Sequence, residues 1–196
     1  MTTKMTLKKI TKKANGLSVF ACFIIPAYTV LFTRGYNWFT TNFSVIGNLI
    51  DRKLAFFLWG LMVGGYYYRI GRIIRTRISL PPLTARLMPL ALVLLFCGIT
   101  TPYLPEELPF KSFLHIVFAF LSTVLLLLYL WSVCQNRCRV QPSVFRPYLW
   151  GLAGIVAVSA FLLVLCGIVS SALEIFLTVS TVILSNRLVQ RLGHGG

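Results

Sequence analysis

One stretch of forty residues, from Pro147 to Asn186, contains a single charged side chain, Glu174. The hydrocarbon core of a bilayer takes roughly 20 apolar residues per helix. The stretch is therefore too long for one membrane-spanning helix and just long enough for two. We expect a helical hairpin that turns near Gly167 to Ser171.

Uncharged segments of 15 to 25 residues, each close to the length of one spanning helix, recur along the rest of the chain. Hydrophobic residues make up 57% of the 196 residues and charged residues only 12%, a balance that a single soluble core could not hide. We therefore predict an all-α fold, a polytopic membrane helix bundle of about six transmembrane helices. A single transmembrane domain, 14–193, would lie between a basic cytoplasmic tail, 1–13, and a short cytoplasmic end, 194–196. The predicted helices cover about 15–33, 53–72, 84–103, 111–134, 147–169 and 171–187.

The basic residues gather on one side of this bundle. If the N-terminus is cytoplasmic, 15 of the 19 Lys and Arg and no acid lie on the cytoplasmic face, and all four acids lie on the outer face. Because Lys and Arg favour cytoplasmic loops, both termini should be cytoplasmic, N-in and C-in. The net charge of +15 then indicates anionic membrane lipids on the cytoplasmic face as partners, and no nucleic acid. A second copy of the chain or another membrane protein is a further candidate partner.

Polar residues gather at the predicted outer face. Ionisable groups in or near a membrane are costly and often serve a function. His115 and Glu174 are the best placed to face the interior of the bundle, and we predict that they form one polar unit whose third side is Asp51, Ser44 or Asn48. The candidate ligand-binding residues are Asn42, Ser44, Asn48, Asp51, His115 and Glu174. If the protein is an enzyme, the candidate catalytic residues among them are His115, Glu174, Asp51 and Ser44.

Several of these residues also have a purely structural interpretation. Ser171-Ala-Leu-Glu174 fits a capping box at the start of the sixth helix. Asp51 and Ser112 stand where helix N-caps belong. Pro147 fits the first turn of the fifth helix.

Neither a metal nor a cofactor is expected. The other histidine, His194, falls on the cytoplasmic tail, so His115 has no His partner, whereas a catalytic zinc often takes more than one. No Walker loop, dinucleotide glycine pattern, Gly-x-Ser-x-Gly elbow or His-Glu-x-x-His stretch occurs in the sequence.

The segment Tyr36-Asn-Trp-Phe-Thr-Thr-Asn-Phe-Ser-Val-Ile-Gly-Asn48, followed by Trp59-Gly60, resembles a family of small bacterial six-helix membrane proteins known only as domain of unknown function number 998. That family similarly brings a Ser-Val-x-Gly stretch to the start of its second helix. The resemblance implies a bacterial cytoplasmic membrane and supplies no activity. The ceramidase and adiponectin-receptor superfamily of membrane hydrolases similarly assembles Ser, Asp and His at one membrane face. Its closing His-x-x-x-His is absent here, which disfavours a metal-dependent lipid amidase.

These residues lead us to expect a non-enzymatic integral membrane protein that binds a lipid or small ligand in an outer-face polar pocket. The alternative is an outer-leaflet lipid-modifying hydrolase that uses His115 with Glu174 or Asp51. A small-molecule transporter comes third, because transport needs a polar path through the membrane and the midplane residues are nearly all apolar. The mild exceptions are Cys97, Gly98 and Ser159.

Cysteine labelling tests the predicted topology. Single-cysteine reporters at Lys9, Arg75 and Arg139, in a chain without its native cysteines, should be shielded from an impermeant thiol reagent in intact cells. A reporter at Glu107 should react, because the positive-inside rule puts it outside. Labelling at position 75 from outside would contradict the topology.

Overall fold

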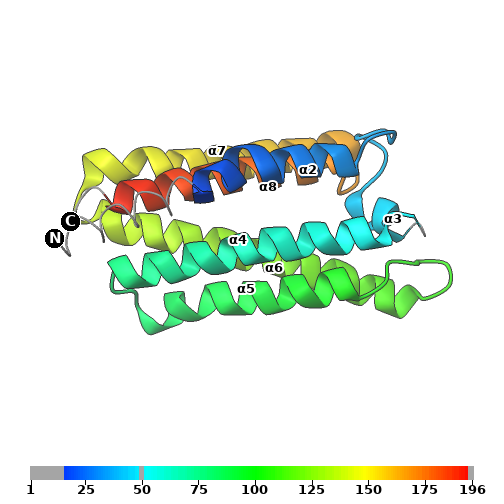
Figure 1. Cartoon of the computed structure of the whole chain (residues 1–196), viewed down its shortest axis with the longest axis horizontal. Helices are drawn as coiled ribbons and strands as arrows, with labels where there is room; N and C mark the ends of the chain where they lie inside the picture. The colour runs from blue at the N-terminus through cyan, green and yellow to red at the C-terminus, as the bar shows by residue number, and fades with distance from the viewer. Residues whose placement is uncertain (1–15, 49–50, 194–196) are drawn as a thin grey trace.

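The computed structural model describes residues 16–48 and 51–193, and within these ranges the regular structure is entirely helical. The long helices run up and down along one axis, so that the molecule is an elongated bundle (Figure 1). The all-α prediction is thus confirmed. The first helix, Gly16–Phe32, is followed by α3 (Phe43–Asn48), α4 (Lys53–Arg77), α5 (Pro82–Thr100), α6 (Pro109–Cys138), α7 (Pro142–Cys166) and α8 (Ser171–Gly193).

A proline shapes the first helix. The helix contains a π-helical turn, η1 (Phe20–Ile24), followed by α2 (Ile25–Phe32). Pro26 has no N–H to donate to the carbonyl four residues earlier, and its ring would crowd that carbonyl. The preceding turn is correspondingly wider, and the Ile25 N–H donates to the Phe20 carbonyl.

Each segment predicted as a spanning helix contains a helix, with differences at the ends. α4 continues five residues beyond the predicted 72, to Arg77. α7 begins at Pro142, which stands in the first turn, so Pro147 lies inside this helix and the prediction for it was wrong. α3 was not predicted at all.

Four helices, α5 to α8, are long and apolar enough to cross a membrane. Their large apolar side chains also face outward. Leu83 of α5 is 75% exposed, Phe110 of α6 is 71% exposed and Val164 of α7 is 82% exposed. Apolar surface of this extent is unfavourable in water and favourable in lipid, which identifies a helical membrane protein.

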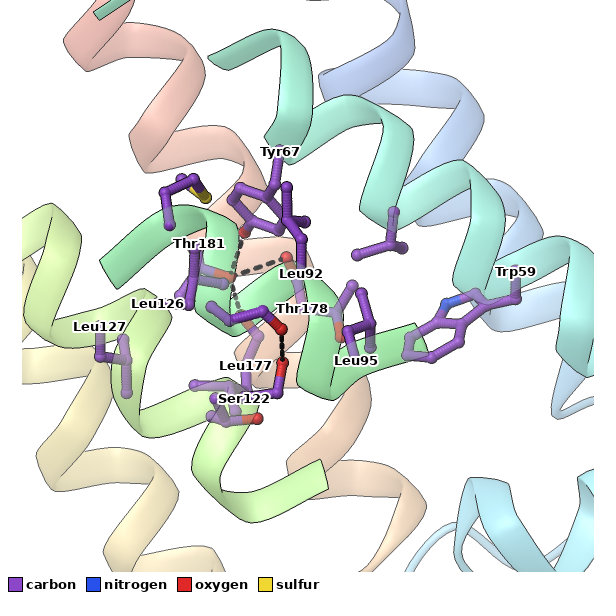
Figure 2. Close-up of a pocket in the computed structure, with 14 residues that line it drawn as sticks. Trp59, Tyr67, Leu92, Leu95, Ser122, Leu126, Leu127, Leu177, Thr178 and Thr181 are labelled. Atoms are coloured by element: carbon purple, nitrogen blue, oxygen red, sulfur yellow. Dashed lines mark hydrogen bonds between the residues drawn. The ribbon is translucent and has the colours of Figure 1, made fainter. Parts of the chain in front are cut away.

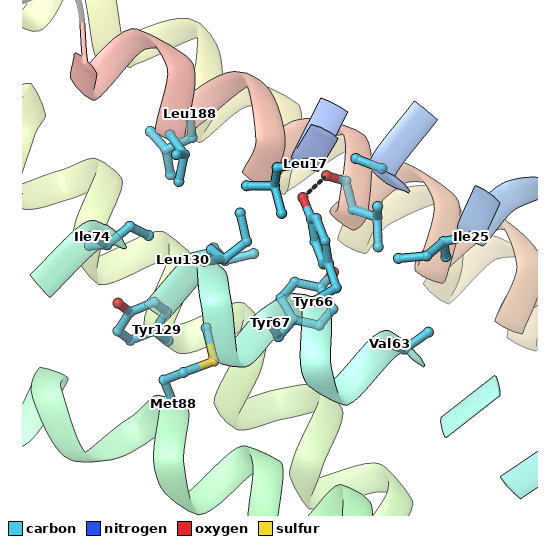
Figure 3. Packing of buried hydrophobic residues seen from close by; sticks show 14 of the residues in the cluster. Leu17, Ile25, Val63, Tyr66, Tyr67, Ile74, Met88, Tyr129, Leu130 and Leu188 are labelled. Carbon is cyan, nitrogen blue, oxygen red and sulfur yellow. Dashed lines mark hydrogen bonds between the residues drawn. The ribbon is translucent and has the colours of Figure 1, made fainter. Parts of the chain in front are cut away.

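α4 is the central helix of the bundle. It packs against the first helix, α3, α5 and α8, and it turns two buried tyrosines toward α8 (Figure 3). The Tyr66 hydroxyl donates to the Val182 carbonyl at 2.8 Å, and the Tyr67 hydroxyl donates to Thr181 Oγ1 at 2.8 Å. These bonds satisfy both phenols and fix α4 against α8.

The two ends of the bundle differ in charge. We call one end the α3 end, since α3 lies there beside the start of α4, the α5–α6 loop and the α7–α8 turn (Figure 1). All four acids of the chain belong to it. The other end, which we call the arginine end, joins α4 to α5 and α6 to α7 and holds the end of α8. Its arginines in the described ranges are Arg69, Arg72, Arg75, Arg77, Arg86, Arg137, Arg139, Arg146, Arg187 and Arg191.

Candidate functional site

α3 is a six-residue helix docked by aromatic contacts at its end of the bundle. Phe43 is fully buried, and its ring packs edge-on against Phe32, with ring centroids 5.5 Å apart, and against Trp59, at 5.1 Å. A Cβ at Gly47 would lie 2.5 Å from the Phe56 ring. Glycine therefore allows α3 to approach α4 this closely.

His115 of α6 contacts the second residue of α3. Its Nε2 lies 2.6 Å from Ser44 Oγ, and its Nδ1 lies 2.9 Å from the Thr101 carbonyl oxygen. A carbonyl only accepts, so Nδ1 carries the hydrogen, and in the neutral ring Nε2 accepts the Ser44 hydroxyl hydrogen. His115 is only 3% exposed. Its ring is thus oriented on one side by a backbone carbonyl and presented on the other to a half-buried serine.

Glu174 caps α3 instead of its own helix. Its Oε2 accepts the Phe43 N–H at 2.7 Å, which supplies a partner for a free N–H in the first turn of α3. The predicted capping box of Ser171 and Glu174 is therefore wrong. Ser170 caps α8, because its carbonyl accepts the Glu174 N–H at 3.0 Å and its hydroxyl accepts the Leu173 N–H at 3.4 Å.

The loop before α3 completes the start of α8. The Ser171 N–H donates to the Thr41 carbonyl at 2.6 Å, and the Ala172 N–H donates to the Trp38 carbonyl at 2.8 Å. Residues more than 120 positions apart in the sequence thus satisfy each other's backbone groups. The α3 loop and the α7–α8 turn form one hydrogen-bonded unit.

The two predicted asparagines support α3 from both ends. Asn42 caps the helix, since its Oδ1 accepts the Val45 N–H at 2.8 Å. Asn48 donates through Nδ2 to the Ser44 carbonyl at 2.6 Å and accepts the Tyr103 N–H through Oδ1 at 3.2 Å. Asn48 therefore joins α3 to the loop that also orients His115.

Asp51 stands apart from this cluster. Its side chain is 75% exposed and lies 3.7 Å from Arg52, and the start of α4 has no side-chain cap. The predicted cap at Ser112 is also absent. Ser112 lies inside α6, where its hydroxyl accepts the Leu104 N–H at 2.8 Å and holds the α5–α6 loop.

Among the described residues there is no direct contact between His115 and Glu174. Both side chains bind α3 instead. Glu174 binds the backbone of Phe43, and His115 binds the side chain of the next residue, Ser44. We call Ser44, Asn48, Thr101, His115 and Glu174 the α3 cluster. The Thr101 carbonyl could not be anticipated from residue types, because any residue offers a carbonyl and only the loop geometry selects this one.

A cavity of about 80 Å³, which we call the crevice, lies between the α5–α6 hairpin, α4 and α8 (Figure 2). Its polar wall comes from hydroxyls, which the expectation of a nearly apolar midplane overlooked. Ser122 donates to the Ala91 carbonyl at 2.8 Å, and Thr181 donates to the Leu177 carbonyl at 2.6 Å. Trp59 lines this crevice and its ring also packs on Phe43, so one aromatic side chain links the crevice to α3.

Among the described residues, no group of three or more His, Cys, Asp or Glu side chains could hold a metal ion. No protein-family model matches the chain, and neither a curated protein nor a solved structure matches it. The resemblance to the six-helix family of unknown function therefore stays a prediction. The function has to be inferred from this chain's own residues.

The Glu174 contact predicts a difference between two substitutions. Glu174→Gln should keep the unfolding temperature close to that of the wild type, because a Gln carbonyl also accepts the Phe43 N–H. Glu174→Leu leaves this N–H without a partner, which costs about 1–3 kcal/mol, and should lower the unfolding temperature in detergent by roughly 3–10 °C. Glu107→Leu, at an exposed acid of the same end, is the control. An unchanged unfolding temperature for Glu174→Leu would show that the cap is dispensable.

Proposed function

We propose that the protein is a non-enzymatic, multi-pass membrane component that binds a membrane lipid. A short segment of one acyl chain would enter the crevice, and the polar part of the lipid would point toward the α3 end. The observation that carries this proposal is the position of the crevice. It lies among α4, α5, α6 and α8, of which the last three are long and apolar enough to cross a membrane, and it reaches Trp59, which packs on the α3 residue Phe43.

The lining of the crevice suits an acyl chain. Apolar side chains such as Leu92, Leu95 and Leu126 form most of it. The hydroxyls of Ser122 and Thr181 are already bonded to backbone carbonyls, so an apolar ligand would leave neither without a partner. A ligand that needed many polar contacts would find few free groups here.

The proposed topology has six spanning helices, N-in and C-in, in a bacterial cytoplasmic membrane. α4 is 25 residues long and packs beside α5 and α8, so it has the length to cross with them. Its lower hydropathy comes from residues such as Tyr66, Tyr67 and Arg69, and both of these tyrosines are buried. The arginine end would then be cytoplasmic and the α3 end external.

Acyl-chain cross-linking tests the binding proposal. In phosphatidylcholine nanodiscs that contain a phosphatidylcholine with a diazirine on its acyl chain, light should attach lipid to the α6 and α8 peptides that contain Ser122 and Thr178. Leu92→Trp fills the crevice and should reduce these adducts several-fold. The matched control is Val93→Trp, since the neighbouring Val93 faces outward at 58% exposure. Equal adducts in both variants would rule out the crevice as the acyl-chain site.

The pairing of Ser44 with His115 favours a second candidate, a lipid ester hydrolase. Ser44 Oγ would attack the ester carbonyl carbon while His115 Nε2 takes the hydroxyl proton and passes it to the oxygen of the leaving alcohol. Water would then hydrolyse the acyl-serine and regenerate Ser44. The Thr101 carbonyl would hold the ring in the required tautomer. Glu174 is engaged by Phe43 and Asp51 is mostly exposed, so neither is favoured as the partner of His115.

A fluorophosphonate probe separates the two candidates. If Ser44 is an activated nucleophile, the probe should modify the peptide that contains Ser44 in vesicle-embedded protein, and Ser44→Ala should abolish the modification. His115→Gln should slow it at least tenfold, because the general base is lost, while the exposed control Glu107→Gln should not change it. Folded wild-type protein that resists the probe would remove the hydrolase candidate and leave lipid binding intact.

A further inference from the structure

A second, larger groove lies between α7 and α8 at the arginine end. It has a volume of about 760 Å³. On α7 the lining runs from Ser143 to Ile155, which is about 18 Å along a helix at about 1.5 Å per residue. On α8 it runs from Ser180 to Arg191. The groove is thus elongated along the helix axes.

The two helices meet closely along this groove. A Cβ at Gly151 of α7 would lie 2.9 Å from the Leu184 side chain of α8, so glycine sets the spacing of the helices there. Ile155 and Ile183 add apolar surface. The floor of the groove is therefore apolar.

Two arginines line the groove near the end of α8, and we call this part of the groove its mouth. Arg187 and Arg191 are one turn apart on α8, and both are exposed. Like charges at this spacing repel each other. No Asp or Glu side chain lies near them, because all four acidic side chains of the chain belong to the opposite end. An anion at the mouth would relieve this repulsion.

We infer that this groove binds one anionic glycerophospholipid from the leaflet at the arginine end, with its phosphate between Arg187 and Arg191 and an acyl chain along the apolar floor. The charge at the mouth complements a phosphate, which guanidinium groups bind with paired hydrogen bonds. The length of the groove, about 18 Å, matches the depth of one leaflet of a hydrocarbon core that is about 30 Å thick. A free phosphate would use only the mouth and leave the apolar floor empty.

The groove site and the crevice site are independent. The crevice lies between the α5–α6 hairpin, α4 and α8, whereas the groove lies between α7 and α8. α8 contributes to both sites, but with different residues. Substitutions at the groove mouth should therefore not change the acyl-chain adducts in the crevice, and Leu92→Trp should not change binding in the groove.

Native mass spectrometry with defined lipids tests the inference. Protein in micelles that contain equal amounts of phosphatidylglycerol and phosphatidylcholine should retain phosphatidylglycerol preferentially. The double variant Arg187→Gln/Arg191→Gln should bind phosphatidylglycerol roughly tenfold more weakly, since two basic groups near the phosphate are lost. The matched control is Arg72→Gln/Arg86→Gln, which removes the same charge from exposed positions at the same end outside the groove.

The outcomes are distinct. Loss of the preference in the groove variant alone supports the site. An equal loss in the control pair would mean that the whole arginine end attracts anionic lipid without a specific site. Unchanged phosphatidylglycerol binding by the groove variant would mean that Arg187 and Arg191 do not bind the lipid. Either result overturns the inference. Displacement of phosphatidylglycerol by millimolar inorganic phosphate would overturn the assignment to a lipid. If the double Gln variant does not fold, Arg187→Lys/Arg191→Lys keeps the charge and should still weaken binding, because Lys lacks the paired guanidinium donors.

Discussion

The Glu174 carboxylate on the Phe43 N–H is the contact on which the rest of the α3 end depends. A helix of six residues is far below the length at which helices are stable alone, so tertiary contacts must hold α3 in place. Glu174 and Asn42 satisfy N–H groups of its first turn, and Phe43 fixes it on Trp59. Only with α3 held in this way does Ser44 face His115. The same contact thus closes this end of the bundle and brings Ser44 to His115.

The sequence was a good guide to the long helices and a poor guide to the details of this end. Uncharged length alone places a helix in each predicted segment, because lipid leaves the backbone few alternatives. Pro147 misled the start of α7, since Pro142 offers the same first-turn signal five residues earlier. α3 escaped notice because its amphipathic pattern is shorter than two helical turns, and its stability comes from residues distant in sequence.

Five of the candidate site residues form hydrogen bonds at the α3 end, but the sequence did not predict their hydrogen-bond partners. These residues are His115, Glu174, Ser44, Asn42 and Asn48. The capping-box prediction was wrong because a carboxylate in the first turn of a helix can accept a hydrogen bond from any free N–H nearby. Phe43, whose N–H is the actual donor, is too distant in the sequence to be recognised as a partner. The crevice hydroxyls were missed for a related reason. A Ser or Thr whose hydroxyl donates to a backbone carbonyl, in its own helix or in a neighbouring one, behaves as a nearly apolar residue.

α8 connects the two proposed lipid sites and keeps them apart. Thr178 and Thr181 face the crevice, whereas Ser180, Leu184 and Arg187 line the groove, so the sites use different faces of one helix. Tyr66 and Tyr67 bind this helix between them, at Val182 and Thr181. A lipid in either site would therefore press on a helix that buried hydrogen bonds already hold against α4. Such a helix can bind lipid on both faces without moving, which favours two separate lipids, one in the crevice and one in the groove, over a single path from end to end.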